Sequence, residues 1–162
     1  MEIRSATGAD WPQVWPVFRD IVRAGETYAY DPDLTSEQAR DLWLTRPPEA
    51  TVVALDGDTL LGTARMGPNR AGRGAHVGTA SFMVAQSARG RGVGRALAAY
   101  VVGWHREQGF RGITFNAVVE TNAVAVAVWE SVGFTVVGRV PGAFEHPAHG
   151  DVDLLVMHLA LG

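Results

Sequence analysis

One stretch near the middle of the chain limits the fold more than any other. A short apolar run ends at Val84, a loop carries Gly90, Gly92 and Gly94, and an alanine- and leucine-rich segment follows. This pattern predicts a strand, a tight glycine loop and a helix. Glycine at alternate positions leaves backbone N–H groups uncovered, and the start of a helix adds unpaired N–H groups of its own. The stretch therefore predicts an anion site at the helix N-terminus.

Arginines surround the same loop. Arg89, Arg91 and Arg95 place positive charge beside the uncovered amides, as a pyrophosphate would require. A P-loop is excluded, because that motif needs a lysine and the chain contains none. The dinucleotide fingerprint G-x-G-x-x-G is excluded as well, because the glycines follow the pattern G-x-G-x-G. The alternative without a ligand is a glycine-rich helix entry with arginines at the surface.

Composition narrows the chemistry further. The chain has 162 residues, a net charge of −3 and no cysteine. The absence of cysteine and lysine excludes a thiol nucleophile, a cysteine zinc site and a Schiff base. The slight negative charge gives no electrostatic argument for binding nucleic acid, and no stretch is apolar over the length of a membrane span. We expect one domain over residues 1–162 of a cytoplasmic, bacterial protein with no metal, no nucleic acid and no membrane partner.

Periodicity and turn signals predict the element order β α α β β β α β α β β. This order is typical of an α+β domain built around one mixed sheet. The expected strands are 2–6, 51–55, 60–66, 76–84, 113–119, 134–140 and 152–159. The expected helices are 11–24, a segment opened by the capping box at Thr35–Gln38, 91–108, and a segment from Asn122 to Val132. We expect residues 141–147 to form a loop.

A second motif lies downstream of the glycine loop. It consists of Asn122, Ala125, Val128, Trp129, Gly133 and Phe134, in the pattern N-x-x-A-x-x-(L/V)-Y-x-x-x-G-F with Trp in place of Tyr. Together with R-x-x-G-x-G at residues 89–94 and the element order, this motif resembles the GNAT acyltransferase superfamily over nearly the whole chain. The resemblance implies the GNAT acyl-CoA N-acyltransferase fold, with about seven strands and four helices. It also implies an acetyl-CoA-dependent N-acetyltransferase of the EC 2.3.1 class.

The resemblance implies how acetyl-CoA, the cosubstrate, would be held. In that superfamily the strand before the glycine loop parts from its neighbour, so backbone groups near Met83 and Val84 would face the pantetheine arm and the thioester. Asn122 would lie near the same arm, although it also fits a plain helix N-cap. The cofactor-binding residues expected on this basis are Met83, Val84, Arg89, Gly90, Arg91, Gly92, Val93, Gly94, Arg95, Asn122 and Trp129.

The implied reaction is direct attack of a neutral amine on the thioester in a ternary complex. In many relatives a tyrosine at the position of Trp129 protonates the leaving thiolate. The indole N–H of tryptophan does not titrate usefully, so Trp129 cannot serve as that acid. The sequence leaves the acid unassigned.

Three residues are candidates for catalysis. Asn116 interrupts an otherwise apolar strand, either to contact the acceptor or to make a structural hydrogen bond to neighbouring backbone. Glu120 is a candidate base because it shares a strand face with Asn116 by the period of two and lies close to Asn122. Glu26 is the other candidate base, in an aromatic segment where the superfamily commonly builds the acceptor wall. Glu120 could instead be a solvated strand end, and water alone could accept the proton.

The acceptor site is expected near four aromatic or histidine side chains. Tyr28 and Tyr30 either line the acceptor pocket or simply pack together. Phe144 and His146 are expected in the loop between the last two strands, which often closes over the acceptor in this superfamily.

The stretch 115–122 narrows the resemblance within the superfamily. It is similar to enzymes that acetylate azetidine-2-carboxylate and other proline analogues, and it has features of phosphinothricin-type acetyltransferases. We expect a small-molecule amine as acceptor, namely an amino acid, a proline analogue or an antibiotic-like amine. A non-catalytic acyl-CoA-binding sensor and a protein N-terminal acetyltransferase stay open as alternatives, as does a homodimer.

Overall fold

The computed structural model describes residues 1–162 and contains one mixed sheet of seven strands in the order β1-β2-β3-β4-β5-β7-β6. The strands are β1 (Glu2–Ser5), β2 (Ala50–Asp56), β3 (Thr59–Pro68), β4 (Val77–Val84), β5 (Gly112–Val119), β6 (Thr135–His146) and β7 (Gly150–Ala160). The helices are α1 (Trp11–Ala24), α2 (Ser36–Trp43), α3 (Val93–Glu107) and α4 (Ala123–Ser131). The predicted element order and the predicted counts of strands and helices are confirmed.

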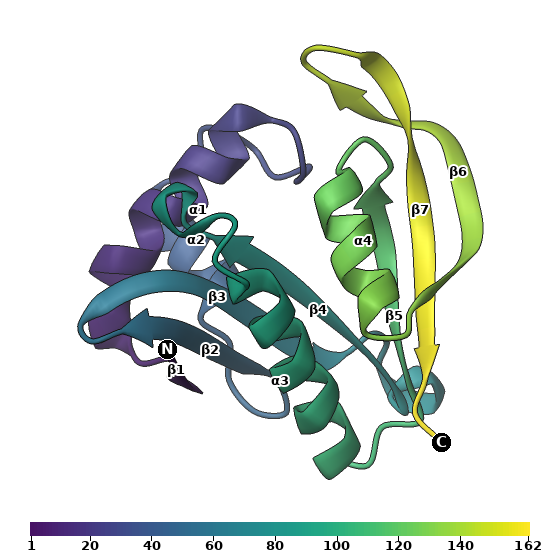
Figure 1. Cartoon of the computed structure of the whole chain (residues 1–162), viewed down its shortest axis with the longest axis horizontal. Helices are drawn as coiled ribbons and strands as arrows, with labels where there is room; N and C mark the ends of the chain where they lie inside the picture. The colour runs from purple at the N-terminus through teal and green to yellow at the C-terminus, as the bar shows by residue number, and fades with distance from the viewer.

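Helices cover both faces of the sheet. Figure 1 shows α1 and α2 on one side and α3 with α4 on the other. The burial of β2 follows from this arrangement, because consecutive strand residues point to opposite faces. Val52 packs in the cluster beneath α3, with Leu97, whereas the adjacent Val53 packs in the cluster beneath α1 and α2, with Phe18 and Trp43. Both faces of this part of the sheet are therefore core.

The sequence signals for helix ends act locally. Gly25 ends α1 in the left-handed conformation, with φ of 67°, which favours glycine. The Thr35 side chain accepts the N–H of Gln38, and the Gln38 side chain accepts the N–H of Thr35, so the predicted capping box opens α2. The Asn122 side chain accepts the N–H of Ala125 at 3.2 Å and opens α4. The predicted end of the first helix at residue 24, the predicted capping box and the N-cap interpretation of Asn122 are confirmed.

Strands β4 and β5 separate soon after they begin. Their parallel pairing is limited to Val77 with Gly112 and Gly78 with Ile113. β5 pairs with β7 on its other side from Gly112 onward. Figure 1 shows β4 and β5 diverging along their length. The sheet is therefore split into two halves that are joined only near the start of β4.

The loop predicted for residues 141–147 is wrong. β6 continues through this segment, with Phe144 opposite Val152 and His146 opposite Gly150. Pro141 does not end the strand, because β6 lies at the edge of the sheet and the pairing shifts register between Val140 and Phe144. The predicted pair of short closing strands is thus one long hairpin.

The start of α1 depends on a buried carboxylate. The Asp10 side chain accepts hydrogen bonds from the Arg4 guanidinium at 2.7 and 2.9 Å and from the N–H of Thr7 at 2.7 Å. The Asp10 side chain makes no capping hydrogen bond to α1, although an aspartate directly before a helix is typical of an N-cap. It closes the turn that precedes the helix instead. The hydrogen bonds from Arg4 lower the pKa of Asp10 to about 2, against the opposing effect of burial.

We expect Asp10→Asn to lower the free energy of unfolding at pH 7 by about 1–2 kcal/mol, after allowance for solvent screening of Arg4. Because the pKa of Asp10 is lower in the folded state, its contribution is complete above about pH 4 and is lost as the pH falls toward 2. Urea unfolding at several pH values in this window measures the difference. Asp20→Asn, in the exposed Arg19–Asp20 pair, is the matched control and should change little. A penalty for Asp10→Asn that did not change with pH would contradict the ionic origin.

Candidate active site

One edge of β4 has no strand partner beyond Gly78. Ala85 donates its N–H to the carbonyl of Leu61 on β3. Because hydrogen-bonded and non-hydrogen-bonded pairs alternate in antiparallel strands, Met83 and Ser81 also direct their backbone groups toward β3. The backbone groups of Phe82 and Val84 therefore point the other way, into the space that β5 has left. The Met83 backbone is directed to β3 and its side chain is buried against α1 and α2, so Phe82 and Val84 are the residues whose backbone faces this space.

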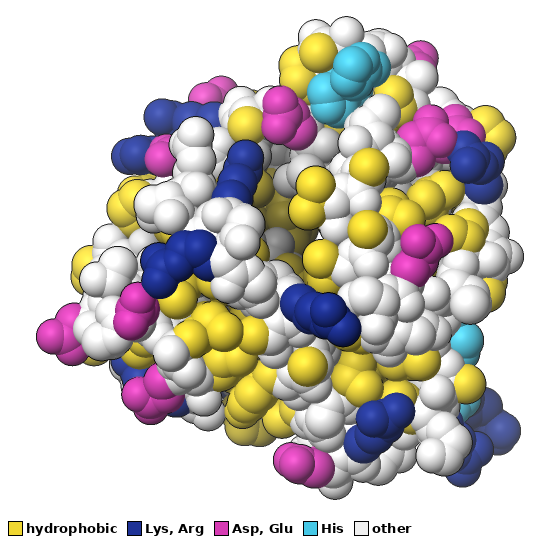
Figure 2. Space-filling model, in the orientation of Figure 1, with side chains coloured by type: hydrophobic (Ala, Val, Ile, Leu, Met, Phe, Trp, Pro, Cys, Tyr) yellow, Lys and Arg dark blue, Asp and Glu magenta, His cyan; other side chains and the backbone are white.

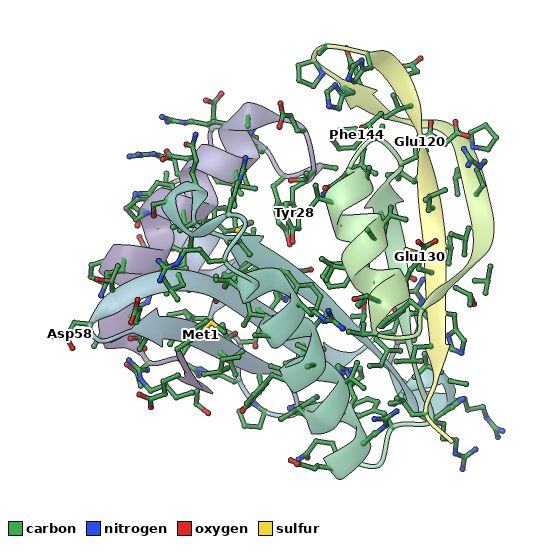
Figure 3. All side chains as sticks on the ribbon, viewed as in Figure 1. Met1, Tyr28, Asp58, Glu120, Glu130 and Phe144 are labelled. Carbon is green, nitrogen blue, oxygen red and sulfur yellow. The ribbon has the colours of Figure 1, made fainter.

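Tyr28 occupies part of this open edge. Its hydroxyl donates to the carbonyl of Phe82 at 2.7 Å and accepts the N–H of the same residue at 2.9 Å. The Tyr28 ring stacks on Tyr30, with centroids 5.5 Å apart, and meets Trp43 edge-on. Figure 3 shows Tyr28 pointing into the space between the α1–α2 layer and α4. Burial of the phenol raises the pKa of Tyr28 well above its ordinary value.

The glycine loop presents bare amides at the start of α3. Gly90 and Gly92 have φ of 74° and 77°, and a Cβ atom built on either would meet nothing within 4 Å. The first backbone hydrogen bond of the helix runs from the N–H of Ala96 to the carbonyl of Gly92. The N–H groups of residues 93–95 therefore have no helical partner, and the space in front of the loop is open.

The charges around this loop are positive and exposed. Arg89, Arg91 and Arg95 are all exposed to solvent, and only Arg91 is held by an ion pair, to Asp56 at 2.9 Å. Bare amides, a helix N-terminus and arginines together suit a diphosphate. The local structure thus fits the pyrophosphate that the sequence predicted.

Trp129 forms the wall opposite Tyr28. Its ring lies 4.4 Å from that of Phe82 and 5.0 Å from that of Phe115, between centroids. Phe82 therefore meets Trp129 through its side chain and Tyr28 through its backbone. Asn122, about two turns before Trp129, makes the N-cap contact that opens the same helix.

A cavity of about 210 Å³ lies on the α1–α2 side of β3 and β4. The residues that line it include Tyr30, Arg65, Thr79, Ala80, Ser81 and Asn116. Figure 2 shows the surface hollowed between the α1–α2 side and α4, with hydrophobic side chains at its bottom and arginines beside it. The glycine loop and this cavity thus flank the open edge of β4.

Asn116 is exposed, and not buried as its apolar neighbours had indicated. A register shift between Phe115 and Val118 turns it outward from β5. Its amide exchanges two hydrogen bonds with the side chain of Asn69, at 2.7 and 3.2 Å. The structural bond is therefore to a side chain on the loop after β3, and not to neighbouring backbone.

Glu120 lies in an ionic cluster at the end of β5. One carboxylate oxygen accepts from the Arg139 guanidinium, and the other accepts the N–H of Asp153 at 3.0 Å. Arg139 also binds the Asp153 carboxylate at 2.7 Å, which lowers the pKa of Asp153. The prediction that Glu120 and Asn116 share a strand face is wrong, because the register shift between Phe115 and Val118 breaks the period of two. Glu26 is exposed and makes no hydrogen bond or ion pair.

Phe144 and His146 lie on β6 and not in a loop. Phe144 is buried with Val119 and Val152, and the His146 ring accepts the N–H of Ala148 at 3.1 Å. Figure 3 shows Phe144 and Glu120 near the same end of the β5–β7 half of the sheet. Both rings lie on a strand of the β6–β7 hairpin, and not in the separate loop that the sequence had predicted.

The sequence did not identify Phe82, Thr79 or Ser81 as site residues. Nothing in their local pattern distinguishes them from other strand residues, because their exposure depends on where β5 leaves β4. The chain has no group of three or more side chains that could hold a metal ion. None of its helices combines the length and the apolar character that a bilayer crossing would need.

Comparison with known proteins supports the same interpretation of the fold. The sequence matches the model of the acetyltransferase (GNAT) family over residues 14–134. It is 30% identical over 151 residues to N-acetyltransferase aca1 of Schizosaccharomyces pombe, covering 83% of this chain and 72% of that protein. The structure is similar to that of a GCN5-related N-acetyltransferase from Kribbella flavida, with 61% identity, a TM-score of 0.96, and coverage of 99% of this chain and 97% of that chain.

A more distant structure shares the fold. A phosphinothricin acetyltransferase from Sinorhizobium meliloti, solved in complex with acetyl-CoA, superposes with a TM-score of 0.89 at 23% identity, covering 99% of this chain and 88% of that chain. The chain belongs to the GNAT family of N-acetyltransferases, which is an acyltransferase class of enzyme. The resemblance seen in the sequence is confirmed.

The glycine loop gives the first test of the site. We expect Gly92→Val to weaken coenzyme A binding by at least about tenfold, because a branched side chain would cover the amides in front of the loop. Isothermal titration calorimetry with coenzyme A measures the effect. Gly109→Val is the matched control, since Gly109 at the far end of α3 has φ of 78° and an equally open Cβ direction. Equal affinity of both variants would remove the loop from the binding site.

Proposed function

We propose that the protein transfers the acetyl group of acetyl-CoA to the amine of a small molecule, by direct attack in a ternary complex. The observation that carries this proposal is the open edge of β4, with bare amides on one side and a small cavity on the other. An acetyl donor and an acceptor can therefore approach the same backbone from two sides. Such an arrangement favours direct transfer, since it needs no covalent enzyme intermediate.

The residues present fit coenzyme A. The amides of residues 90–95 would take the pyrophosphate, and Arg89, Arg91 and Arg95 would neutralise its charge. The backbone of Val84, which has no partner on this edge, would take the extended pantetheine arm, as an open strand edge takes an added strand. The arm would reach the backbone of Phe82 only where it replaces the Tyr28 hydroxyl that now holds both of its polar groups. Trp129 and Asn122 would line the same path from α4. Bound there, acetyl-CoA supplies an activated acetyl thioester.

The cavity supports a small acceptor. Its volume of about 210 Å³ is below the range typical of drug-sized ligands and suits a molecule of amino-acid size. Arg65 is only partly exposed, and its guanidinium donates to the carbonyl of Leu42 and, weakly at 3.4 Å, to Glu49. Its remaining donors can meet a carboxylate. We therefore favour an amino acid or a proline analogue over a peptide N-terminus.

The acceptor must lose a proton before it attacks, and we propose that Glu26 accepts it. Glu26 has no competing partner and lies in the segment that brings Tyr30 to the cavity and Tyr28 to the open edge of β4. Asn116, held by Asn69 at the cavity wall, would orient the acceptor. Glu120 stays the alternative base, although both of its oxygens already accept hydrogen bonds.

We expect wild-type protein to release coenzyme A from acetyl-CoA when amino acids or proline analogues are added. Amides of the same amino acids should react with a lower kcat/KM, because they lack the carboxylate that Arg65 would bind. Thiol formation is measured with a disulfide reagent, and the signal is unambiguous because the protein contains no cysteine. Peptides and aminoglycosides complete the panel. Acetyl-CoA binding without thiol release on any amine would overturn the enzymatic proposal.

The two candidate bases are separated by a pair of isosteric variants. We expect Glu26→Gln to lower kcat/KM at pH 7 by about tenfold or more, with recovery at higher pH, where the acceptor amine is already neutral. Glu120→Gln should keep the wild-type pH dependence and change thermal stability little, since the ion pair to Arg139 that it removes is largely exposed. The reverse result would assign the base to Glu120. Wild-type profiles for both variants would leave water as the proton acceptor.

A further inference from the structure

Acetyl transfer ends with a proton on sulfur. The carbon–sulfur bond breaks, the electron pair passes to the sulfur of coenzyme A, and near neutral pH this thiolate takes up a proton because thiols ionise at about pH 8.5. Trp129, on the wall of the open edge, cannot donate this proton, since an indole does not titrate in this range. A different group must supply it or the solvent must enter the site.

The phenol of Tyr28 is held at the open edge from the opposite side. Its hydroxyl lies 2.7 Å from the carbonyl oxygen and 2.9 Å from the nitrogen of Phe82. The ring of the same residue contacts Trp129 at 4.4 Å. Tyr28 and Trp129 therefore approach one residue of β4 from two walls, and Phe82 lies midway along the edge that would take the pantetheine arm.

Resting on the proposed function, we infer that Tyr28 is the acid that protonates the departing thiolate of coenzyme A. The thioester carbonyl would take the N–H of Phe82 that Tyr28 now accepts, which frees the hydroxyl to turn toward the sulfur. Tyr28 then gives its proton to sulfur as the carbon–sulfur bond breaks. The resulting phenolate regains a proton from solvent, so the net change is an amide, a thiol and one proton released from the acceptor ammonium.

The surroundings keep Tyr28 protonated until it is used. Burial raises the pKa of Tyr28, and the neighbouring Tyr30 acts in the same direction. The Phe82 backbone, the Ser81 hydroxyl and the Arg65 guanidinium act in the opposite direction with smaller effect. These groups come from the α1–α2 segment, β4 and β3, and among them only Arg65 carries a charge at pH 7. The hydroxyl is therefore protonated throughout the physiological range. A raised pKa also makes it a weaker acid, so its proposed role in proton transfer depends on the position of the hydroxyl at Phe82 and not on the shift.

The test is Tyr28→Phe, which removes the hydroxyl and keeps the ring that stacks on Tyr30. We expect kcat with acetyl-CoA at pH 7 to fall by about a hundredfold. The deficit should shrink above about pH 9, where the thiolate no longer needs a proton. The matched control is Tyr100→Phe on α3, which removes a partly buried hydroxyl that makes no hydrogen bond, and it should leave kcat unchanged.

A second measurement does not depend on turnover. A hydrogen bond from Tyr28 to the sulfur would stabilise the thiolate and lower the pKa of the coenzyme A thiol in its complex. The rate of alkylation of bound coenzyme A as a function of pH reports this pKa, since the protein has no cysteine of its own. We expect the pKa of the bound thiol to be higher in Tyr28→Phe than in wild type. Thermal unfolding of both variants checks that the fold is intact.

The outcomes are distinguishable. If Tyr28→Phe lowered kcat a hundredfold at every pH and left the pKa of the bound thiol unaltered, Tyr28 would be a hydrogen-bond donor to the thioester carbonyl. That result would overturn its role as the acid. If Tyr28→Phe kept the wild-type kcat and bound acetyl-CoA more tightly, Tyr28 would only occupy the open edge of β4 in competition with the cofactor. That result would also overturn its role as the acid. Wild-type protein that releases no thiol with any amine would instead overturn the proposed function, and the acid with it.

Discussion

The parting of β4 from β5 is the constraint on which the rest of the structure depends. β5 leaves β4 after two paired residues, while its other edge stays paired with β7 from Gly112 to Val119. The rings of Phe82, Phe115, Trp129 and Phe134 fill the core beneath α4 on that side. An unpaired strand edge inside a protein is costly, since its backbone groups need partners. Here the Tyr28 hydroxyl forms hydrogen bonds with both backbone polar groups of Phe82. A bound pantetheine arm could provide partners for the other unpaired backbone groups of this edge.

Charged side chains are distributed differently on the two parts of the sheet that separate between β4 and β5. The chain as a whole carries a net charge of −3, yet arginines gather around the start of α3, where the bare amides of the glycine loop lie. The opposite ionic cluster, of Glu120, Arg139 and Asp153, ties β5, β6 and β7 together away from the loop. Ion pairs of this kind contribute little stability when exposed. They do hold side chains in place. Glu120, a candidate base from the sequence, thereby has both carboxylate oxygens engaged in hydrogen bonds.

A chain with neither cysteine nor lysine has few groups for covalent catalysis, so positioning must supply most of the rate. The structure provides two walls around a single stretch of β4: Trp129 from α4, and Tyr28 from the segment after α1. The cavity beside Thr79 and Ser81 opens next to the same stretch. In the proposed reaction the donor, the acceptor and the proton source would meet beside this stretch of β4 without movement of the sheet.

The sequence by itself determined those features that depend on neighbours a few residues apart. The ends of α1, α2 and α4, the glycine loop and the order of elements all follow from hydrogen bonds or backbone conformations within one turn. Only the tertiary structure decided the rest. The register shift that exposes Asn116, the continuation of β6 through Pro141, and the contact of Tyr28 with Phe82, 54 positions away, depend on which strands pair. Pairing joins distant segments, and a one-residue shift turns a side chain to the other face, so local pattern cannot fix it.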